Sequence, residues 1–218
     1  MNYRFILPLM TTAVLEQTVV TIVRVTTSYR AVELGLSVVW LGVITTAIAV
    51  LPLLLAVKVG RYIDQGNELK TAAIGAGLLC LACGGFAVWP SLTGLLLFTA
   101  LLGLGHLMLV ISQQILCASD PTPGALERNI GNYMVSNAIG QGLGPFIVGY
   151  VGGDASLPPT AWLFMAGFLG SFVMFAASLM LRPGGPRKPK VEKSDPMPLR
   201  DILPVSYTHL TLPTNREV

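Results

Sequence analysis

The chain has 218 residues, of which 53% are hydrophobic and only 11% are charged, and its mean hydropathy is +0.68. This composition is too apolar for a soluble domain of this size and excludes a large extramembrane catalytic domain. The formal net charge of +3 does not indicate nucleic-acid binding, because the basic residues lie between and after apolar runs. We therefore predict an all-α, polytopic membrane protein whose surface contacts the lipid bilayer.

Six apolar runs separated by turn signals predict six transmembrane helices, since about 20 apolar residues cross the hydrocarbon core. In chain order the helices are expected near 5–28, 37–57, 71–89, 94–117, 130–151 and 160–181. The first run is not a cleaved signal peptide, because it carries Glu16, Gln17 and Arg24. Residues 1–181 are thus predicted to form one six-helix bundle.

Lysine and arginine are concentrated in alternate loops, which predicts the orientation of the bundle. The outer loops hold Arg30 and almost no other basic residue if the N-terminus is cytoplasmic. The basic residues then facing the cytoplasm are Arg4, Lys58, Arg61, Lys70, Arg128, Arg182 and those that follow it. We expect a multi-pass protein of the cytoplasmic (inner) membrane with its N-terminus and linker in the cytoplasm.

The sequence after Arg182 becomes polar, basic and rich in proline, which is typical of a segment that does not fold alone. Residues 182–204 are predicted to be a cytoplasmic linker between two bundles; the alternative is a basic tail attracted to anionic lipid. Residues 205–218 resemble one reading frame of a DNA sequencing adapter, so we exclude them as non-native, His209 included. The natural protein is expected to continue past Pro204.

Three cysteines, Cys80, Cys83 and Cys117, lie inside apolar runs, where cysteine acts as a small hydrophobe. Cys80 and Cys83 form a C-x-x-C, but no second ligand pair accompanies them, so we predict no metal site and no cofactor. The sequence also lacks a Walker-type phosphate loop, a zincin pattern and a nucleophile elbow. Enzymatic activity is therefore not expected.

A polar stripe runs along the first predicted helix. Gln17, Thr21, Arg24 and Ser28 follow steps of four, three and four, which places them on one face, with Glu16 at its edge. A charge in hydrocarbon costs at least about 2.5–3.5 kcal/mol, so an intramembrane Glu or Arg is a functional candidate. Glu16 is the main candidate for proton exchange. Arg24 either lines the cavity or extends to the outer surface.

The fourth and fifth predicted helices add polar candidates. His106 is the titratable residue of the fourth span, and it either exchanges protons with a carboxylate or is a hydrogen-bonded packing residue. Gln113 lies further along the same helix. Asn137 and Gln141, one turn apart on the fifth helix, offer neutral groups that could orient a ligand.

A possible gating motif lies between the second and third predicted helices, in Gly60-Arg-Tyr-Ile-Asp64-Gln-Gly66-Asn-Glu-Leu-Lys70. Gly60 lets helices approach, and Asp64 can cap a neighbouring helix or pair with a cation, which would hold one closed state. The segment resembles the signature loop of the major facilitator superfamily, with Gly60 and Asp64 matching. It departs from that pattern at Gln65, at the early Gly66 and in having only Lys70 as its final basic residue. Without the resemblance, it is an ordinary positively charged turn.

A helix-packing motif lies on the fifth predicted helix. Gly140 and Gly144 are four residues apart and form a smooth face, Pro145 removes a backbone hydrogen bond, and Gly149 begins a second such face. The segment resembles the glycine-proline motif of superfamily antiporters, with one extra residue after Gly144-Pro145. It can also be read as an ordinary small-residue packing face.

Together these resemblances imply the N-terminal half of a twelve-helix transporter, in which two bundles rock about a substrate site at the membrane midplane. They imply a small-molecule substrate, protons as the coupling ion and a C-terminal six-helix bundle as partner. We predict proton-coupled efflux, with Glu16 exchanging the proton, Gln17, Arg24, His106, Asn137 and Gln141 lining the cavity, and Asp64 gating.

Two other functions remain open at this point. A facilitator or uptake porter without proton coupling would use the same fold, and its transport would respond little to pH. A six-helix membrane subunit or sensor that does not transport is the structural alternative, and its natural reading frame would stop shortly after Pro204.

Overall fold

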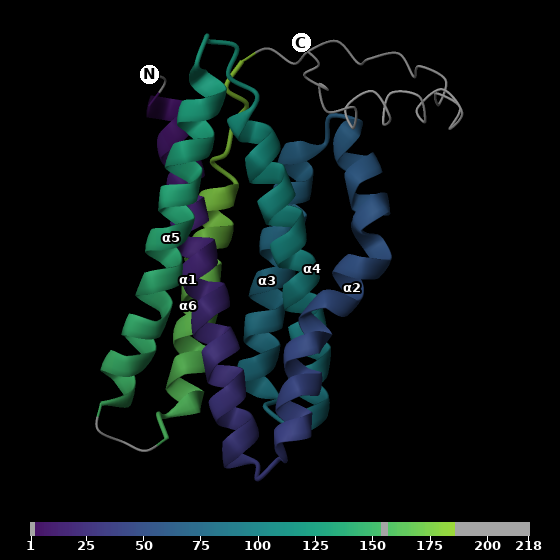
Figure 1. Ribbon diagram of the computed structural model, residues 1–218, viewed down its shortest axis with the longest axis vertical. Coiled ribbons are helices and arrows are strands. Elements are labelled where there is room, and N and C mark those ends of the chain that lie inside the picture. Colours follow the sequence, from purple (N-terminus) through teal and green to yellow (C-terminus); the bar gives the residue numbers. More distant parts are fainter. Residues whose placement is uncertain (1–2, 154–156, 186–218) are drawn as a thin grey trace, which may run out of the picture. The chain divides into compact units, whose positions relative to one another are not determined.

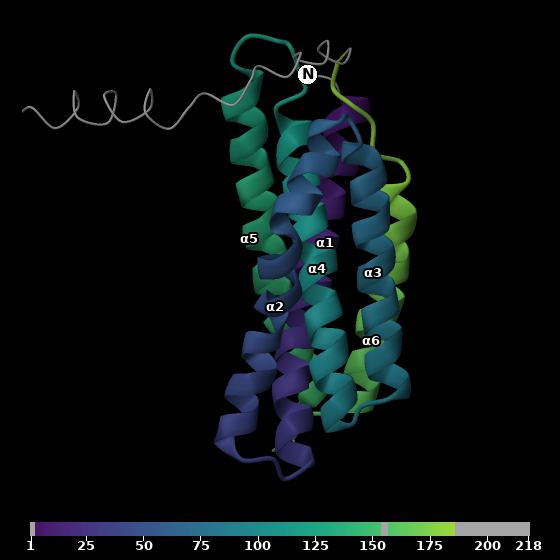
Figure 2. The ribbon, with the colours of Figure 1, turned by 90° about the vertical axis from the view of Figure 1, so that its right-hand side faces the viewer.

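A computed structural model describes residues 3–153 and 157–185 of the chain, and these residues form six α-helices and no strand. The helices are α1 (Tyr3–Glu33), α2 (Val38–Asp64), α3 (Glu68–Val88), α4 (Leu92–Cys117), α5 (Ala125–Gly152) and α6 (Thr160–Ser178). Successive helices run antiparallel, so the turns α2–α3 and α4–α5 lie at the same end as the start of α1 (Figures 1 and 2). The predicted all-α fold with six helices is confirmed.

Several helices extend beyond the apolar runs that predicted them. α1 ends at Glu33 rather than near 28, α2 ends at Asp64 rather than near 57, and α5 begins at Ala125 rather than near 130. α6 ends earlier than expected, at Ser178. Apolar runs mark only the part of a helix that hydrocarbon covers, whereas backbone hydrogen bonds continue the helix into polar flanks.

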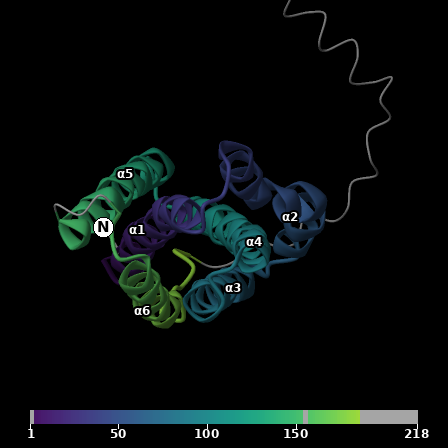
Figure 3. The same cartoon turned by 90° about the horizontal axis from the view of Figure 1, so that it is seen from below.

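The described helices pair in a repeated pattern. α1 packs mainly against α5 and α6, α4 packs mainly against α2 and α3, and α3 packs against α6. If α1, α2 and α3 are exchanged with α4, α5 and α6 in that order, the same set of pairs results. This is the arrangement expected of two related three-helix units. Viewed from below, α1 and α4 lie between α5 and α2 (Figure 3). The two central helices therefore hold the side chains that meet inside the bundle.

Five helices are long and apolar enough to cross a membrane, namely α1, α2, α3, α4 and α6. α5 is not among these five, but it has 28 residues. At about 1.5 Å per residue that length is about 42 Å, which exceeds a hydrocarbon core of about 30 Å. The length of α5 is thus sufficient for a sixth span.

Glycines let the central helices approach their outer neighbours. A Cβ at Gly140 in α5 would lie 2.5 Å from the carbonyl oxygen of Val14 and 2.7 Å from the Cβ of Gln17, both in α1. At the corresponding contact between α4 and α2, a Cβ at Gly103 would overlap the carbonyl oxygen of Ile48. Both contacts need a residue without a side chain, because backbone atoms occupy the space.

The chain after α6 packs back onto the α4–α5 turn. The backbone N–H of Gly184 donates to the hydroxyl of Ser119 at 2.7 Å. In the same turn the hydroxyl and backbone N–H of Thr122 donate to Asp120 at 2.6 and 3.0 Å, and these bonds hold the pKa of that carboxyl below its usual value. The described residues belong to one compact unit, and the proposed linker beyond residue 185 and the tail 205–218 lie outside the described residues.

Candidate functional site

A carboxylate and an imidazole meet inside the bundle. Glu16 of α1 is completely buried, and its Oε1 lies 2.8 Å from Nδ1 of His106 in α4. Glu16 is two residues from the middle of its 31-residue helix, about 3 Å along the axis. The His106 side chain remains 30% exposed. The pair therefore joins a buried carboxylate to a second titratable group with an open side.

Further polar groups surround this pair. Gln113 of α4 lies beside Glu16, and Tyr133 of α5 lies near both Glu16 and Asn137. Several buried atoms here have no hydrogen-bond partner in the described chain: Glu16 Oε2, both amide atoms of Gln113, the Tyr133 hydroxyl and Asn137 Oδ1. Buried polar atoms are normally satisfied, so this polar cluster has the chemistry to hold water around the carboxylate.

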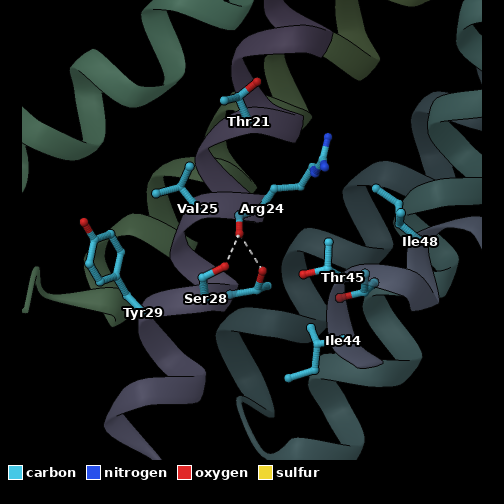
Figure 4. Close-up of a pocket in the computed structure, with 10 residues that line it drawn as sticks. Thr21, Arg24, Val25, Ser28, Tyr29, Ile44, Thr45 and Ile48 are labelled. Carbon is cyan, nitrogen blue, oxygen red and sulfur yellow. Dashed lines mark hydrogen bonds between the residues drawn. The ribbon is translucent and has the colours of Figure 1, made fainter. Parts of the chain in front are cut away.

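A separate cavity of about 430 Å³ opens between α1 and α2 (Figure 4). Arg24 is its cationic residue, and it is exposed in the described chain. The lining is completed by Thr21, Val25, Thr27, Ser28, Tyr29, Ile44, Thr45, Ile48 and Thr99. Arg24 is eight residues from Glu16 on α1, about 12 Å along the axis, so the cavity and the carboxylate are distinct sites.

The predicted polar stripe of α1 is divided by its neighbours. Gln17 is only 8% exposed, because Gly140 brings α5 against it. Thr21 lies against Gly144 and also lines the cavity. Ser28 faces the cavity with Arg24. One half of the stripe therefore packs against α5, and the other half stays open beside α2.

The remaining cavity candidates lie in different surroundings. His106 and Gln113 join the Glu16 cluster, and Asn137 is half-buried with its Oδ1 turned inward. Gln141, one turn further along α5, is exposed. The described helices therefore bring four of the seven predicted pathway residues together and leave Arg24, Gln17 and Gln141 outside that cluster.

The predicted gating motif does not form a loop over its first half. Gly60 and Asp64 lie on the last turns of α2, and only residues 65–67 separate α2 from α3. Gly66 has a φ of +81°, a left-handed conformation that favours glycine, and its N–H donates to the carbonyl of Ile63 at 2.8 Å. This helix-ending role explains why the glycine stands at position 66. Asp64 and Lys70 are exposed at the two sides of the turn.

The packing motif behaves differently along α5. A Cβ at Gly144 would come within 2.6 Å of the Thr21 Cβ, so Gly144, like Gly140, lies against α1. Pro145 lies within the helix and is exposed. A Cβ added at Gly149 would have no neighbour within 4 Å in the described chain, so a packing role for this glycine stays a prediction.

A second polar network lies at the end of the bundle opposite the α2–α3 turn. Arg30 forms an ion pair with Glu33 at 2.8 Å and donates through Nε to the carbonyl of Pro90 at 3.0 Å. The hydroxyl of Thr160 donates to the same Glu33 carboxylate at 2.7 Å. These bonds connect the end of α1 to the α3–α4 turn and to the start of α6.

Sequence reasoning missed Tyr133 and Thr99. Tyr133 stands four residues before Asn137, so helical spacing could have placed it on the same face. Thr99 has no such signal, because one threonine in an apolar helix is ordinary. The three cysteines are free thiols, and the described residues contain no group of three His, Cys, Asp or Glu side chains placed to hold a metal ion.

Comparison with known proteins identifies the family. A family model described as the Major Facilitator Superfamily matches residues 9–212, which is most of the 218-residue chain and reaches all six helices. Searches of curated proteins and of solved structures gave no match. The described fold, with its two related three-helix units, agrees with this family. The chain therefore belongs to the Major Facilitator Superfamily, a family of membrane transporters.

Proposed function

We propose that this chain is the N-terminal half of a proton-coupled transporter that exports a small solute by alternating access. The observation that carries the proposal is the 2.8 Å contact between the buried Glu16 carboxylate and His106. A carboxylate at this depth is costly to keep charged without a partner. Its protonation is therefore tied to the arrangement of the two helices that hold the pair.

The pair can link proton uptake to movement of α1 against α4. When the pair holds one proton and that proton is on His106, the positive imidazole stabilises the negative Glu16 carboxylate. A second proton neutralises Glu16 and removes the ionic part of that contact. Because α1 and α4 are the central helices of the two three-helix units, weakening their contact favours a change in their packing.

The orientation that we propose follows the charges at the two ends of the bundle. Exposed Lys58, Arg61, Lys70, Arg128 and Arg182 belong to the end that includes the α2–α3 and α4–α5 turns. At the opposite end, Arg30 is neutralised by Glu33 at 2.8 Å. The positive-inside rule then puts the first end, and with it the N-terminus and the linker, in the cytoplasm at the inner membrane.

A second six-helix bundle is the partner that the proposal requires. Arg24 and Gln141 are polar and exposed on helices of membrane-spanning length. Hydrocarbon does not solvate such groups, so they face water or protein. The Asp64 side chain makes no hydrogen bond or ion pair within the described chain, which leaves its carboxylate available to gate the cytoplasmic side against that partner.

Glu16→Gln in the complete transporter tests the coupling. Substrate-induced proton flux would be measured in proteoliposomes with a pH-sensitive dye, using a panel of small solutes with a pH gradient across the membrane. We expect Glu16→Gln to abolish proton flux and gradient-driven transport while exchange of labelled solute persists, because the amide cannot exchange a proton. Glu127→Gln, which removes an exposed carboxylate from the first turn of α5, is the matched control.

Unchanged transport by Glu16→Gln across a pH series would contradict the coupling role. If transport by the wild-type protein were also independent of the pH gradient, the protein would be an uncoupled porter and the proposed proton coupling would be wrong.

A further inference from the structure

The cavity beside Arg24 offers few free hydroxyl donors. Most hydroxyl groups of its lining donate to the carbonyls of their own helices: Thr21 to Gln17 at 2.7 Å, Thr27 to Arg24 at 2.8 Å and Thr45 to Leu41 at 2.8 Å. Figure 4 shows two hydroxyl groups bonded to the carbonyl of Arg24. Their protons are therefore not available to a ligand.

Besides the Tyr29 hydroxyl, which points away from the Arg24 guanidinium in Figure 4, two donors of the lining have no partner in the described chain. The Arg24 guanidinium makes no ion pair or hydrogen bond within residues 3–153 and 157–185. Thr99 of α4 is only 4% exposed, and its hydroxyl has no partner in the described chain. A guanidinium has five N–H donors and no acceptor, so the group that satisfies it must be rich in acceptors.

The depth of Arg24 makes an anionic partner the expected one. Arg24 lies six residues from the middle of α1, about 9 Å along the axis, which is within the half-thickness of about 15 Å of the hydrocarbon core. Glu33 pairs with Arg30 and Glu16 contacts His106, so neither acidic residue of α1 neutralises Arg24. An uncompensated guanidinium at this depth is costly, and bound carboxylate or phosphate oxygens would stabilise it.

The rest of the lining indicates that the anion has an apolar part. Ile44 and Ile48 of α2 form an apolar wall on the side to which the Arg24 guanidinium extends, and Val25 lies on the opposite side of Arg24 (Figure 4). The volume of about 430 Å³ lies within the range of roughly 300–1,000 Å³ that is usual for small-molecule sites. A ligand with a charged group near Arg24 and an apolar body against Ile44 and Ile48 would fill the cationic and the apolar parts of the cavity.

We infer that the Arg24 cavity binds a small organic anion, held by the Arg24 guanidinium and the Thr99 hydroxyl against the wall formed by Ile44 and Ile48. This inference rests on the proposed transport function and names its substrate class. The anionic headgroup of a lipid shares the same chemistry, so the test must separate the two sources.

Three ring compounds of similar shape and different charge provide the probes: benzoate is negative, benzamide neutral and benzamidine positive. The full chain would be placed in nanodiscs made only of phosphatidylcholine, and its melting temperature measured against the concentration of each probe. We expect benzoate alone to raise the melting temperature. Arg24→Gln should weaken the apparent affinity for benzoate roughly ten- to a hundredfold, since hydrogen bonds to charged groups are strong.

Three variants separate charge from geometry and folding. Arg24→Lys keeps the charge and should recover part of the affinity, and Thr99→Val should reduce it several-fold. Arg128→Gln removes one exposed positive charge from the first turn of α5, away from the cavity, and should leave the affinity unchanged. The melting temperature of each variant without probe reports whether it folds.

Equal responses to the three probes, or an unchanged benzoate response in Arg24→Gln, would overturn the inference. It would also be overturned if phosphatidylglycerol raised the melting temperature of the wild type but not of Arg24→Gln, while benzoate had no effect; the anion would then be a lipid headgroup.

The transport measurement distinguishes this inference from the proposed function. A complete protein that carried only neutral or cationic solutes would leave proton-coupled transport standing and exclude an anionic substrate. If no solute were transported but benzoate bound in an Arg24-dependent manner, the cavity assignment would stand and the transport proposal would fail.

Discussion

Glu16 and His106 are 90 residues apart in sequence, and helices α1 and α4 hold them 2.8 Å apart. The carboxylate is fully buried, whereas the imidazole keeps 30% of its side chain exposed. Each side chain is therefore a hydrogen-bond partner of the other, and removing one leaves the second without that contact. Mutation of either residue should show this dependence as a change in stability.

His106→Ala should destabilise the chain by about 1–3 kcal/mol, because it leaves a buried carboxylate without its partner. Adding Glu16→Gln to that variant should recover part of the loss, since a neutral amide tolerates burial better. Denaturation of the chain in detergent, arranged as a double-mutant cycle, would measure the coupling. Additive effects of the two substitutions would mean that the contact does not exist in the membrane protein.

Arg24, unlike Glu16, is a charged residue of α1 without a partner in the described chain, although it stands only six residues from the middle of α1. The sequence left open whether Arg24 lines a cavity or extends to the outer surface, and in the described chain it lines the cavity beside α2. That cavity could not be predicted, because its wall comes from Ile44 and Ile48 on another helix.

At the scale of elements, α5 is fixed to α1 by two glycines. Gly140 and Gly144 both face α1, and added Cβ atoms would lie 2.5 Å from the Val14 carbonyl oxygen and 2.6 Å from the Thr21 Cβ. Gly142, between them, has no neighbour within 4 Å of an added Cβ in the described chain. The small-residue face is therefore one side of α5 only.

Gly140→Ala should lower stability by about 1–3 kcal/mol, because the methyl group forces α1 and α5 apart. Gly142→Ala is the matched control, and it should be neutral or stabilising by up to about 1 kcal/mol, since alanine favours the helix. Thermal melting of the chain in detergent would compare the two variants. Equal melting temperatures would show that Gly140 is not at a close helix contact.

The position at which α2 ends changes how the predicted gating motif is placed in the structure. The sequence resemblance placed Gly60 and Asp64 in a loop, but α2 continues through both residues and is followed by Gly66, whose φ is +81°. Helix boundaries are hard to predict here, because polar residues at a helix end obey the same backbone bonding as apolar ones. The motif therefore presents Asp64 from the end of a helix.

At the scale of the whole described bundle, lysine and arginine are distributed unevenly between the two ends. Exposed basic residues gather at the α2–α3 and α4–α5 turns, whereas Arg30 at the other end is paired with Glu33. This asymmetry is the basis for the orientation that we propose.

Cysteine labelling tests that orientation. In a background with Cys80, Cys83 and Cys117 replaced by alanine, Ser37→Cys and Gln65→Cys place one exposed thiol at each end of α2. A membrane-impermeant maleimide added to intact cells should label Ser37→Cys and not Gln65→Cys, and inside-out vesicles should reverse the result. The reverse pattern in intact cells would show that the bundle is inserted the other way.

The sequence by itself determined the membrane as solvent, the number and approximate position of the helices, and the family, through Gly60, Asp64 and the glycines of α5. These properties depend on hydropathy and on local spacing, which a linear sequence contains. Only the tertiary structure decided that Glu16 meets His106, that α5 covers Gln17, and that Arg24 opens onto α2. Those contacts join helices far apart in the chain, so they follow from how the helices pack and not from the sequence of any one of them.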